Sequence, residues 1–360
     1  METDVVNSLG TFSDSEYYIV PNFSCNNFYL PSSIQLFESL GNFGVGLVTV
    51  ASMLCAACVY LAVDACSNIC YRKESQSVKI NACAVLSVYP IASLCSLAAL
   101  ALPRAQLLSE GLTQVSLTIS LYRLFQLLLE LGLRGASKAP TLALKVGPCC
   151  CWPCLPMPSL EMTEANLSWL RLTVLQLPIV QGLIYCILLF MSAEAPIFAT
   201  SYGRFFQPLV IISILLGIYG LTVVTKSLQD IAPETKLAQR TIVAQMVLLF
   251  SKLQGFLIKG LVDTGLFPCN PPLTPLVYAN VTYDALMVIE MLLLCYAARL
   301  IYAGDENEAV VTNNASNASS NGGQTDQQRD KSLTNGHDSV SLQIQQQQHA
   351  PAATPKNQTS

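Results

Sequence analysis

The chain has 360 residues, of which 52% are hydrophobic and 12% are charged, and its net charge is −4. A soluble domain carries about 25% charged residues, so this composition excludes an ordinary soluble protein and predicts a polytopic membrane protein. The two histidines, His337 and His349, both lie in a polar C-terminal stretch. Histidine-based catalysis and metal binding are therefore excluded from the apolar part. We expect no enzyme activity, no cofactor, no bound metal and no nucleic-acid partner.

The chain divides into a head, an apolar middle and a polar tail. Residues 1–40 contain acidic residues but no lysine or arginine, so we expect this head outside the cell, where the sequon at Asn22 would accept a glycan. Asn, Ser, Gln and Gly dominate from residue 304 onward, and such a composition cannot bury enough apolar surface to fold. We therefore expect a membrane domain at residues 41–303 and a disordered cytoplasmic tail at 304–360.

Seven apolar runs in the middle each have about the 20 residues needed to cross a bilayer. They predict an all-α bundle of seven transmembrane helices, at residues 41–63, 82–102, 112–133, 172–193, 208–225, 242–262 and 281–302. Basic residues gather in the loops after the first, third and fifth runs, whereas the other loops carry only Arg104 and Arg204. Because cytoplasmic loops carry the excess of Lys and Arg, we expect the N-terminus outside and the C-terminus inside.

Prolines and glycines within the runs predict local features of the helices. Pro90 and Pro178 are expected to kink the second and fourth spans. Small residues allow neighbouring helices to approach closely or to move against each other, and we expect one or the other at Gly217, Gly220, Gly255 and Gly260.

A cysteine-rich loop at residues 147–156 follows the third run and lies on the cytoplasmic side in this topology. It holds three prolines, which exclude a regular helix, and four cysteines: Cys149, Cys150, Cys151 and Cys154. Palmitoylation is typical of such juxtamembrane cysteines. A zinc site is a second interpretation, because the last two cysteines have CxxC spacing and Cys66 and Cys70 could complete four ligands. The third is a reduced cluster that only packs.

Two cysteines lie outside the membrane in this topology, Cys25 in the head and Cys269 in the last outer loop. An oxidising compartment favours a disulfide, so we expect a bridge that ties the head to this loop. The alternative is two free thiols.

Ionisable residues within the apolar runs are costly there and are candidates for function. Counting about 1.5 Å per residue from the start of each run puts Arg123, Lys252 and Glu290 at the bilayer midplane. The same count puts Lys259 and Asp284 together near the outer surface. Two interpretations stay open: ion pairs that hold the sixth and seventh spans together, or a midplane site whose surplus positive charge suits an organic anion.

Several other seven-span classes lack support in the sequence. A rhodopsin-like receptor would show an acid-Arg-Tyr motif in the third span and Asn-Pro-x-x-Tyr in the seventh, and neither occurs. A membrane hydrolase would need histidines or paired catalytic acids in the spans, and no Walker-type loop is present. A receptor or scaffold without transport activity stays as the alternative to a transporter.

Two segments carry a recognisable pattern. The third span has Ser-Leu-Tyr-Arg-Leu-Phe-Gln at residues 120–126, and the cysteine-rich loop begins Gly-Pro-Cys-Cys-Cys-Trp-Pro-Cys at residues 147–154. Together they resemble the organic solute transporter alpha-subunit family. The resemblance covers roughly residues 35–305 and agrees with seven spans, an outer head and a polar inner tail.

The resemblance implies facilitated, sodium-independent transport of bile acids, conjugated steroids and related amphipathic anions across the plasma membrane, basolateral in a polarised epithelium. It also implies a small single-span beta subunit as partner and acylation of the cysteine-rich loop. We expect Arg123 and Lys252 to attract the anionic head, Glu290 to position Lys252, and Tyr122 and Gln126 to complete the binding site. The sterol-like body would lie along apolar faces and enter from membrane lipid.

Overall fold

The computed structural model describes residues 30–134, 141–142, 160–161, 163–194, 196–229, 236–270 and 273–320. The chain separates into two units, Met1–Glu308 and Ala309–Ser360, and the bundle described below belongs to the first. The described part of the second unit is helical up to Ser320. The last helix therefore continues past the boundary expected at residue 303, and residues 321–360 of the expected tail lie outside the described residues.

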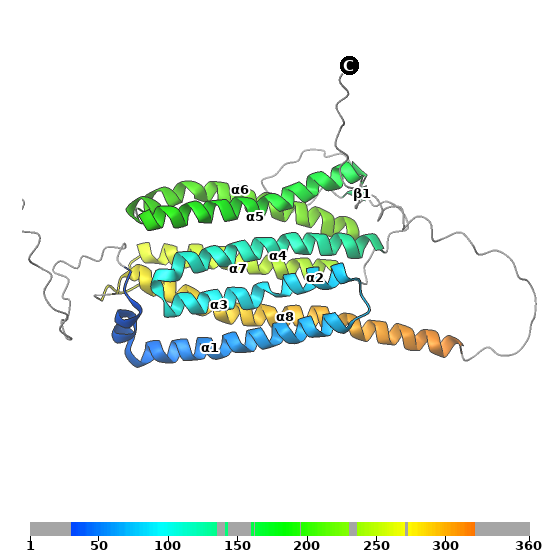
Figure 1. The fold of residues 1–360 in the computed structure, drawn as a ribbon, viewed down its shortest axis with the longest axis horizontal. Helices are drawn as coiled ribbons and strands as arrows, with labels where there is room; N and C mark the ends of the chain where they lie inside the picture. Colours follow the sequence, from blue (N-terminus) through cyan, green and yellow to red (C-terminus); the bar gives the residue numbers. More distant parts are fainter. Residues whose placement is uncertain are drawn as a thin grey trace, which may run out of the picture. The chain divides into compact units, whose positions relative to one another are not determined.

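The described residues form eight α-helices, one short 3-10 helix and two two-residue strands (Figure 1). The helices are α1 (Ser33–Tyr71), α2 (Gln76–Leu86), α3 (Val88–Ala101), α4 (Gln106–Arg134), α5 (Glu164–Glu194), α6 (Pro196–Gln229), α7 (Leu237–Asp263) and α8 (Pro275–Ser320). The 3-10 helix is η1 (Pro103–Ala105), and β1 (Thr141–Leu142) pairs antiparallel with β2 (Leu160–Glu161). The all-α class is confirmed.

Among the described residues, seven helical segments are long and apolar enough to cross a membrane, which agrees with the predicted number of spans. They are Ser33–Tyr71, Gln76–Ala101, Pro103–Arg134, Ala165–Glu194, Phe205–Gln229, Leu237–Val262 and Pro275–Tyr302. Each is longer than the run predicted for it, because helices continue past the roughly 30 Å hydrocarbon core. The side of the membrane on which each terminus lies stays a prediction.

Helices α2 and α3 form one span that is interrupted at Ser87. The Ser87 amide donates to the Cys83 carbonyl (2.9 Å), and its hydroxyl donates to the Ala84 carbonyl (2.8 Å). Pro90 has no amide hydrogen for the carbonyl of Leu86, so the regular ladder stops here. The interruption agrees with the kink predicted at Pro90, whereas α5 continues as one helix through Pro178.

Gly41 bends α1 near its start. Its φ of 54° lies in the left-handed region that favours glycine. The turns before it, residues 33–40, form a short segment that we call the cap helix, and Ser32 and Gln35 close its first turn as a capping box. Leu36 in the cap helix packs against Leu273 and Val277 at the start of α8. We call this end of the bundle, where α1, α4 and α8 begin, the head end, and the opposite end the tail end.

Helix α4 lies at the centre of the packing. It contacts α2, α3, α5, α6 and α7, and Leu124, Phe125, Leu127 and Leu128 are fully buried. Helix association in lipid depends on close packing rather than on removal of apolar surface from water. With neighbours on most sides, the polar residues of α4 face other helices rather than lipid.

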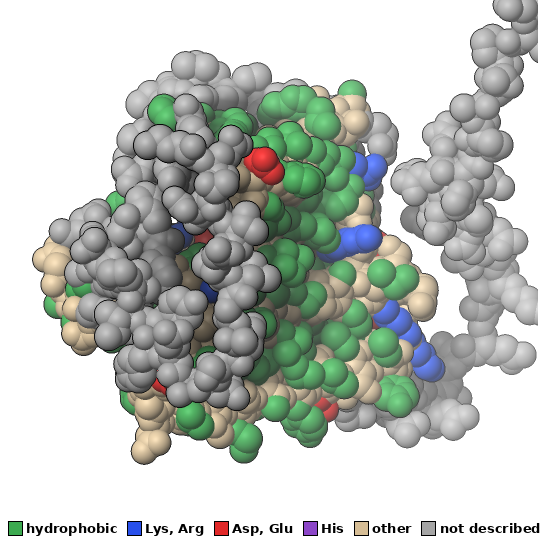
Figure 2. All heavy atoms as spheres, turned by 60° about the vertical axis from the view of Figure 1, so that its left-hand side comes forward, with side chains coloured by type: hydrophobic (Ala, Val, Ile, Leu, Met, Phe, Trp, Pro, Cys, Tyr) green, Lys and Arg blue, Asp and Glu red, His purple; other side chains and the backbone are tan. Residues whose placement is uncertain are grey.

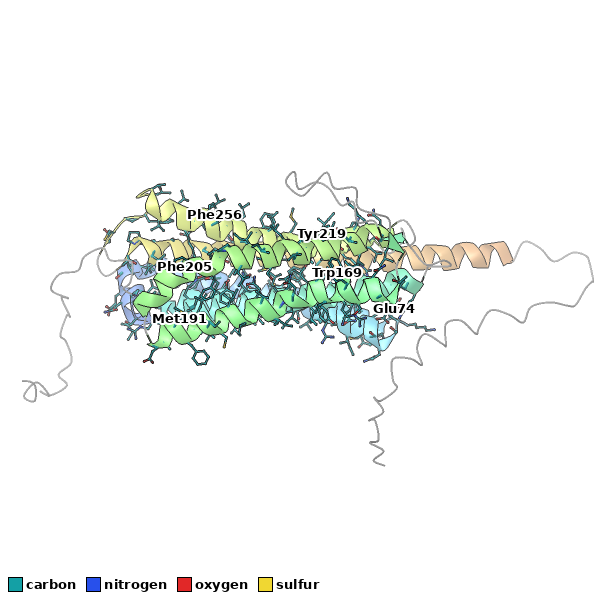
Figure 3. All side chains as sticks on the ribbon, turned by 90° about the horizontal axis from the view of Figure 1, so that it is seen from above. Glu74, Trp169, Met191, Phe205, Tyr219 and Phe256 are labelled. Carbon is teal, nitrogen blue, oxygen red and sulfur yellow. The ribbon has the colours of Figure 1, made fainter. Side chains whose placement is uncertain are left out.

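The outer surfaces of the surrounding helices are apolar, as a bilayer requires. Hydrophobic side chains cover much of the exposed flank in Figure 2. Figure 3 labels three large ones, Trp169, Phe205 and Phe256, which are 57%, 74% and 76% exposed. A surface of this kind is expected to contact lipid chains.

Two glycines mark places where helices lie very close together. A Cβ atom at Gly217 on α6 would lie 1.9 Å from Cδ1 of Leu177 on α5, and one at Gly132 on α4 would lie 2.9 Å from Cβ of Leu228 on α6. The predicted close approach at Gly217 is thus confirmed. A Cβ at Gly260, by contrast, would have no neighbouring atom within 4 Å.

We predict that Gly132→Ala lowers the free energy of unfolding by about 1–3 kcal/mol, because Leu228 is fully buried and its Cβ cannot rotate away. Thermal unfolding of the purified protein in detergent measures the change. Gly260→Ala is the matched control and should leave Tm unchanged or slightly raised, since alanine is the better helix former. An unchanged Tm for Gly132→Ala would contradict the close packing of α4 on α6.

Candidate functional site

Polar side chains from four helices meet in the head-end half of the bundle. We call this set the polar seam, and its members are Glu110 and Gln114 on α4, Tyr185 on α5, Ser251, Lys252 and Lys259 on α7, and Tyr283 and Asp284 on α8. Hydrocarbon offers no hydrogen bonds, so such groups must find their partners within the protein or in a ligand.

Two contacts between α4 and α7 run along the seam. Glu110 Oε2 lies 3.6 Å from Lys259 Nζ, and one turn further along α4 the Gln114 side-chain amide donates to Ser251 Oγ at 2.8 Å. Glu110 and Gln114 are four residues apart and therefore share one face of α4. The two contacts fix the register of α4 against α7.

Tyr185 connects α5 to both of these helices. Its hydroxyl donates to Glu110 Oε1 at 3.3 Å, and Lys252 Nζ lies 5.9 Å from the centre of its ring, within the range of a cation–π interaction. Gly111 makes room for the ring, because a Cβ there would lie 3.3 Å from Tyr185 Cδ1. Lys252 thus lies against an aromatic face.

Helix α8 closes the seam through Tyr283 and Asp284. The Tyr283 hydroxyl lies 3.4 Å from Ser251 Oγ and donates to the Ser251 carbonyl at 3.4 Å. Asp284 is 3% exposed. It lines a small cavity of about 10 Å³ together with Ser96, Ser109, Glu110, Thr113 and Tyr283, which is room for about one water molecule.

The structure places Lys259 and Asp284 at the same end of the bundle, but it does not join them as an ion pair. Lys259 instead pairs with Glu110, a residue that the sequence reasoning missed. Asp284 Oδ2 is buried and has no hydrogen-bond partner among the described residues. The count along each helix predicted the depth of these residues but not the directions in which their side chains point.

Arg123 lies further toward the tail end than predicted. It is nine residues beyond Gln114 on α4, or about 13 Å along the helix, whereas Lys252 follows Ser251, the partner of Gln114. Its guanidinium donates to Asn81 Oδ1 on α2 at 3.5 Å. Arg123 and Lys252 are therefore at different levels, and the expected single layer at the midplane is wrong for Arg123.

The other residues predicted to bind substrate, Glu290, Tyr122 and Gln126, are half-buried. Glu290 on α8 has a buried Oε2 without a hydrogen-bond partner, and within the described ranges it forms no ion pair with Lys252. Tyr122 packs beside the main apolar cluster, and Gln126 follows it on α4 one turn later. Their contacts do not show whether these three residues bind substrate, so this role stays a prediction.

The expected modification sites fall mostly outside the described residues. This is true of Asn22, Cys25 and the four cysteines of the loop at 147–156. Cys269 is disulfide-bonded, as predicted, but its pairing with Cys25 stays a prediction. Cys66 and Cys70 are free thiols, and among the described residues no three His, Cys, Asp or Glu side chains gather as a metal site.

Lys252 is the cation of the seam that is open to a further partner. Lys259 is engaged by Glu110, whereas Lys252 has no carboxylate within ion-pair distance in the described part of the chain and contacts an aromatic ring instead. One turn from Tyr185, Gln181 on α5 is fully buried, and neither atom of its side-chain amide has a partner there. Buried amides normally have hydrogen-bond partners, and an anionic ligand with hydrogen-bonding groups would provide them.

We predict that Glu110 and Lys259 are energetically coupled. A double-mutant cycle with Glu110→Gln and Lys259→Gln, measured by thermal unfolding, should give a coupling energy of about 0.5–1 kcal/mol, because both side chains are partly exposed. A cycle that combines Glu110→Gln with Lys73→Gln, a substitution in the α1–α2 connection, should give none. Equal coupling energies in the two cycles would show that Glu110 does not interact with Lys259 in the polar seam.

Comparisons with known proteins agree with this architecture. The family model of the organic solute transporter Ostalpha matches residues 47–307, which include every residue of the polar seam. The organic solute transporter subunit alpha of Danio rerio is 23% identical over 282 residues, which cover 76% of this chain and 86% of that protein. No solved structure matches significantly. Seven spans together with a family match over most of its length show that the chain belongs to the organic solute transporter alpha family.

Proposed function

We propose that the chain carries amphipathic organic anions, in particular bile acids and conjugated steroids, across the plasma membrane. Transport is facilitated and sodium-independent, and the chain acts as the alpha subunit of a complex with a single-span beta subunit. Family membership supports solute transport by a multi-pass alpha subunit. The observation that carries the substrate class is Lys252, a cation inside the bundle that lies against a tyrosine ring and has no carboxylate partner among the described residues.

The environment of Lys252 suits a carboxylate or sulfonate. An anion at this position would gain a charge-assisted hydrogen bond in a place of low dielectric constant, where such a bond is stronger than in water. The ring of Tyr185 would lie beside the apolar part of the substrate, and the side-chain amide of Gln181 could bond its hydroxyl or amide groups. These features together favour an amphipathic anion over a small inorganic one.

Three cations at different depths suggest a path for the anion. Lys259 lies near the head end, Lys252 is seven residues or about 10 Å further in, and Arg123 is about 13 Å beyond the level of Lys252. We propose that the anionic group passes these positions in turn while the sterol body follows apolar faces and exchanges with lipid. Glu290, Tyr122 and Gln126 would line the inner part of this path.

The remaining features of the proposal concern assembly and location. The thiols Cys149, Cys150, Cys151 and Cys154 would carry acyl chains that hold their loop at the inner leaflet. A disulfide from Cys25 to Cys269 would tie the outer head to the start of α8, and Asn22 would carry a glycan. In a polarised epithelium the complex would lie in the basolateral membrane.

We predict that Lys252→Gln lowers uptake of a labelled steroid sulfate about 10-fold or more, since a hydrogen bond to a charged group contributes about 1.5–3 kcal/mol. Uptake is measured without a sodium gradient, in cells that express this chain with candidate single-span partners. Lys73→Gln, which removes a lysine from the α1–α2 connection, is the matched control and should transport normally.

Surface labelling must show equal amounts of each variant. Normal uptake by Lys252→Gln would rule out the proposed anion site. An absence of saturable flux in the wild type with every partner, when the protein is at the surface, would favour the receptor or scaffold alternative.

A further inference from the structure

The buried carboxyl group of Asp284 has no role in the transport path described so far. It lies on α8 beside the cavity at the head end, and its Oδ2 atom has no hydrogen-bond partner among the described residues. A buried carboxylate that is neither paired nor fully hydrogen-bonded is strongly disfavoured. A bound proton or a bound cation would remove this cost.

The surroundings of Asp284 contain hydroxyl groups and one other carboxylate. The side chains of Ser109, Glu110 and Thr113 on α4, Ser96 on α3 and Tyr283 on α8 line the same cavity. Gln106 on α4 also faces Asp284, and the ammonium of Lys259 on α7 acts on it from a greater distance. Towards α1, the neighbouring residue Ala285 packs in an apolar cluster with Leu47 and Val48.

Lys259, the cation that acts on Asp284 within the described part of the chain, is already engaged. Lys259 Nζ lies 3.6 Å from Glu110 Oε2, and Glu110 also accepts from Tyr185. Asp284 therefore shares its cavity with a carboxylate that already engages Lys259 and the Tyr185 hydroxyl. Two ionised carboxylates beside one small cavity repel each other, and a single proton relieves this repulsion. The cavity holds about one water molecule, which could deliver the proton but leaves little room for a hydrated metal ion.

We propose that Asp284 is a proton-binding site that controls the affinity of the polar seam for organic anions. This inference rests on the proposed transport function. With Asp284 protonated, Lys252 and Lys259 outnumber the ionised Glu110, so the seam carries one surplus positive charge. With Asp284 ionised, the surplus disappears. A proton bound at Asp284 thus raises the affinity of the polar seam for an anion, and loss of this proton lowers that affinity.

The proposal predicts that uptake of a steroid sulfate rises several-fold when the outer pH is lowered from about 7.5 to about 5.5. A sulfate ester stays ionised over this range, whereas a carboxyl group in an unusual environment can titrate within it. Asp284→Asn should give uptake that no longer changes with outer pH. Glu38→Gln, which removes an exposed carboxyl group on the cap helix, should keep the pH dependence of the wild type.

A second measurement does not depend on transport. If the folded chain holds a proton that the unfolded chain releases at neutral pH, acid must stabilise the folded state. The Tm of the purified wild type in detergent should therefore rise by several degrees between about pH 7.5 and about pH 5.5, and Asp284→Asn should lose most of this rise. Glu38→Gln again serves as the control.

The two measurements separate failure of this inference from failure of the proposed function. An absence of flux at every pH, together with a Tm rise that depends on Asp284, would contradict the transport function but keep the proton site. Flux and Tm that respond to pH equally in wild type and Asp284→Asn would overturn the proton site. Stabilisation of the wild type by sodium at about pH 7.5, lost in Asp284→Asn, would also overturn it, because the ligand would then be a cation.

Discussion

Glu110 joins three helices at the head end of the bundle, and the arrangement of the polar seam depends on it. Its carboxylate lies beside the ammonium of Lys259 on α7 and accepts the hydroxyl of Tyr185 on α5. Because α4 is surrounded by other helices, this carboxylate is held away from lipid and has to be satisfied by its neighbours. It engages Lys259 and the Tyr185 hydroxyl and so leaves Lys252 as the cation open to an anion. It also leaves Asp284 with one buried carboxyl oxygen, Oδ2, that has no hydrogen-bond partner among the described residues.

The two ends of the bundle differ in how completely their charges are paired. At the tail end, Arg134 binds Glu74 and Glu130 at 2.9 and 2.8 Å, and Arg299 binds Asp64 at 2.6 Å. These contacts connect α4 to the start of α2 and α8 to α1. At the head end, the one described ion pair is longer, and several buried polar atoms lack partners. The tail end is thus held together by ion pairs, whereas the head end keeps polar groups without partners among the described residues. This difference fits the proposal that ligands enter and leave at the head end.

Hydropathy predicted the seven spans well, because membrane insertion depends directly on the number of consecutive apolar residues. It predicted the polar seam only in part. Helix α4 begins at Gln106, six residues before the predicted run. Glu110 therefore lies outside that run, and Arg123 lies further from the head end than a count along the run predicts. Depth along a helix can be counted from sequence, but the face on which a side chain lies relative to its neighbours depends on packing. For this reason the sequence predicts Asp284, and not Glu110, beside Lys259.

A clearer signal for Glu110 was present in the sequence. The residue is acidic and lies two residues before a predicted run that contains few charges, on the side of the membrane predicted for Lys259. Tyr185 carried no comparable signal, since a tyrosine in an apolar run is ordinary, and its role depends on the small Gly111 opposite its ring.

The most direct test of transport through the polar seam is counterflow with the purified protein in lipid vesicles, reconstituted with a single-span partner. Vesicles are loaded with unlabelled steroid sulfate, and entry of a trace of labelled substrate is followed in the absence of sodium. A carrier predicts transient accumulation of label above its equilibrium level, abolished by Lys252→Gln. Simple equilibration without overshoot in the wild type would contradict a carrier, and an overshoot unchanged in Lys252→Gln would show that the anion crosses elsewhere.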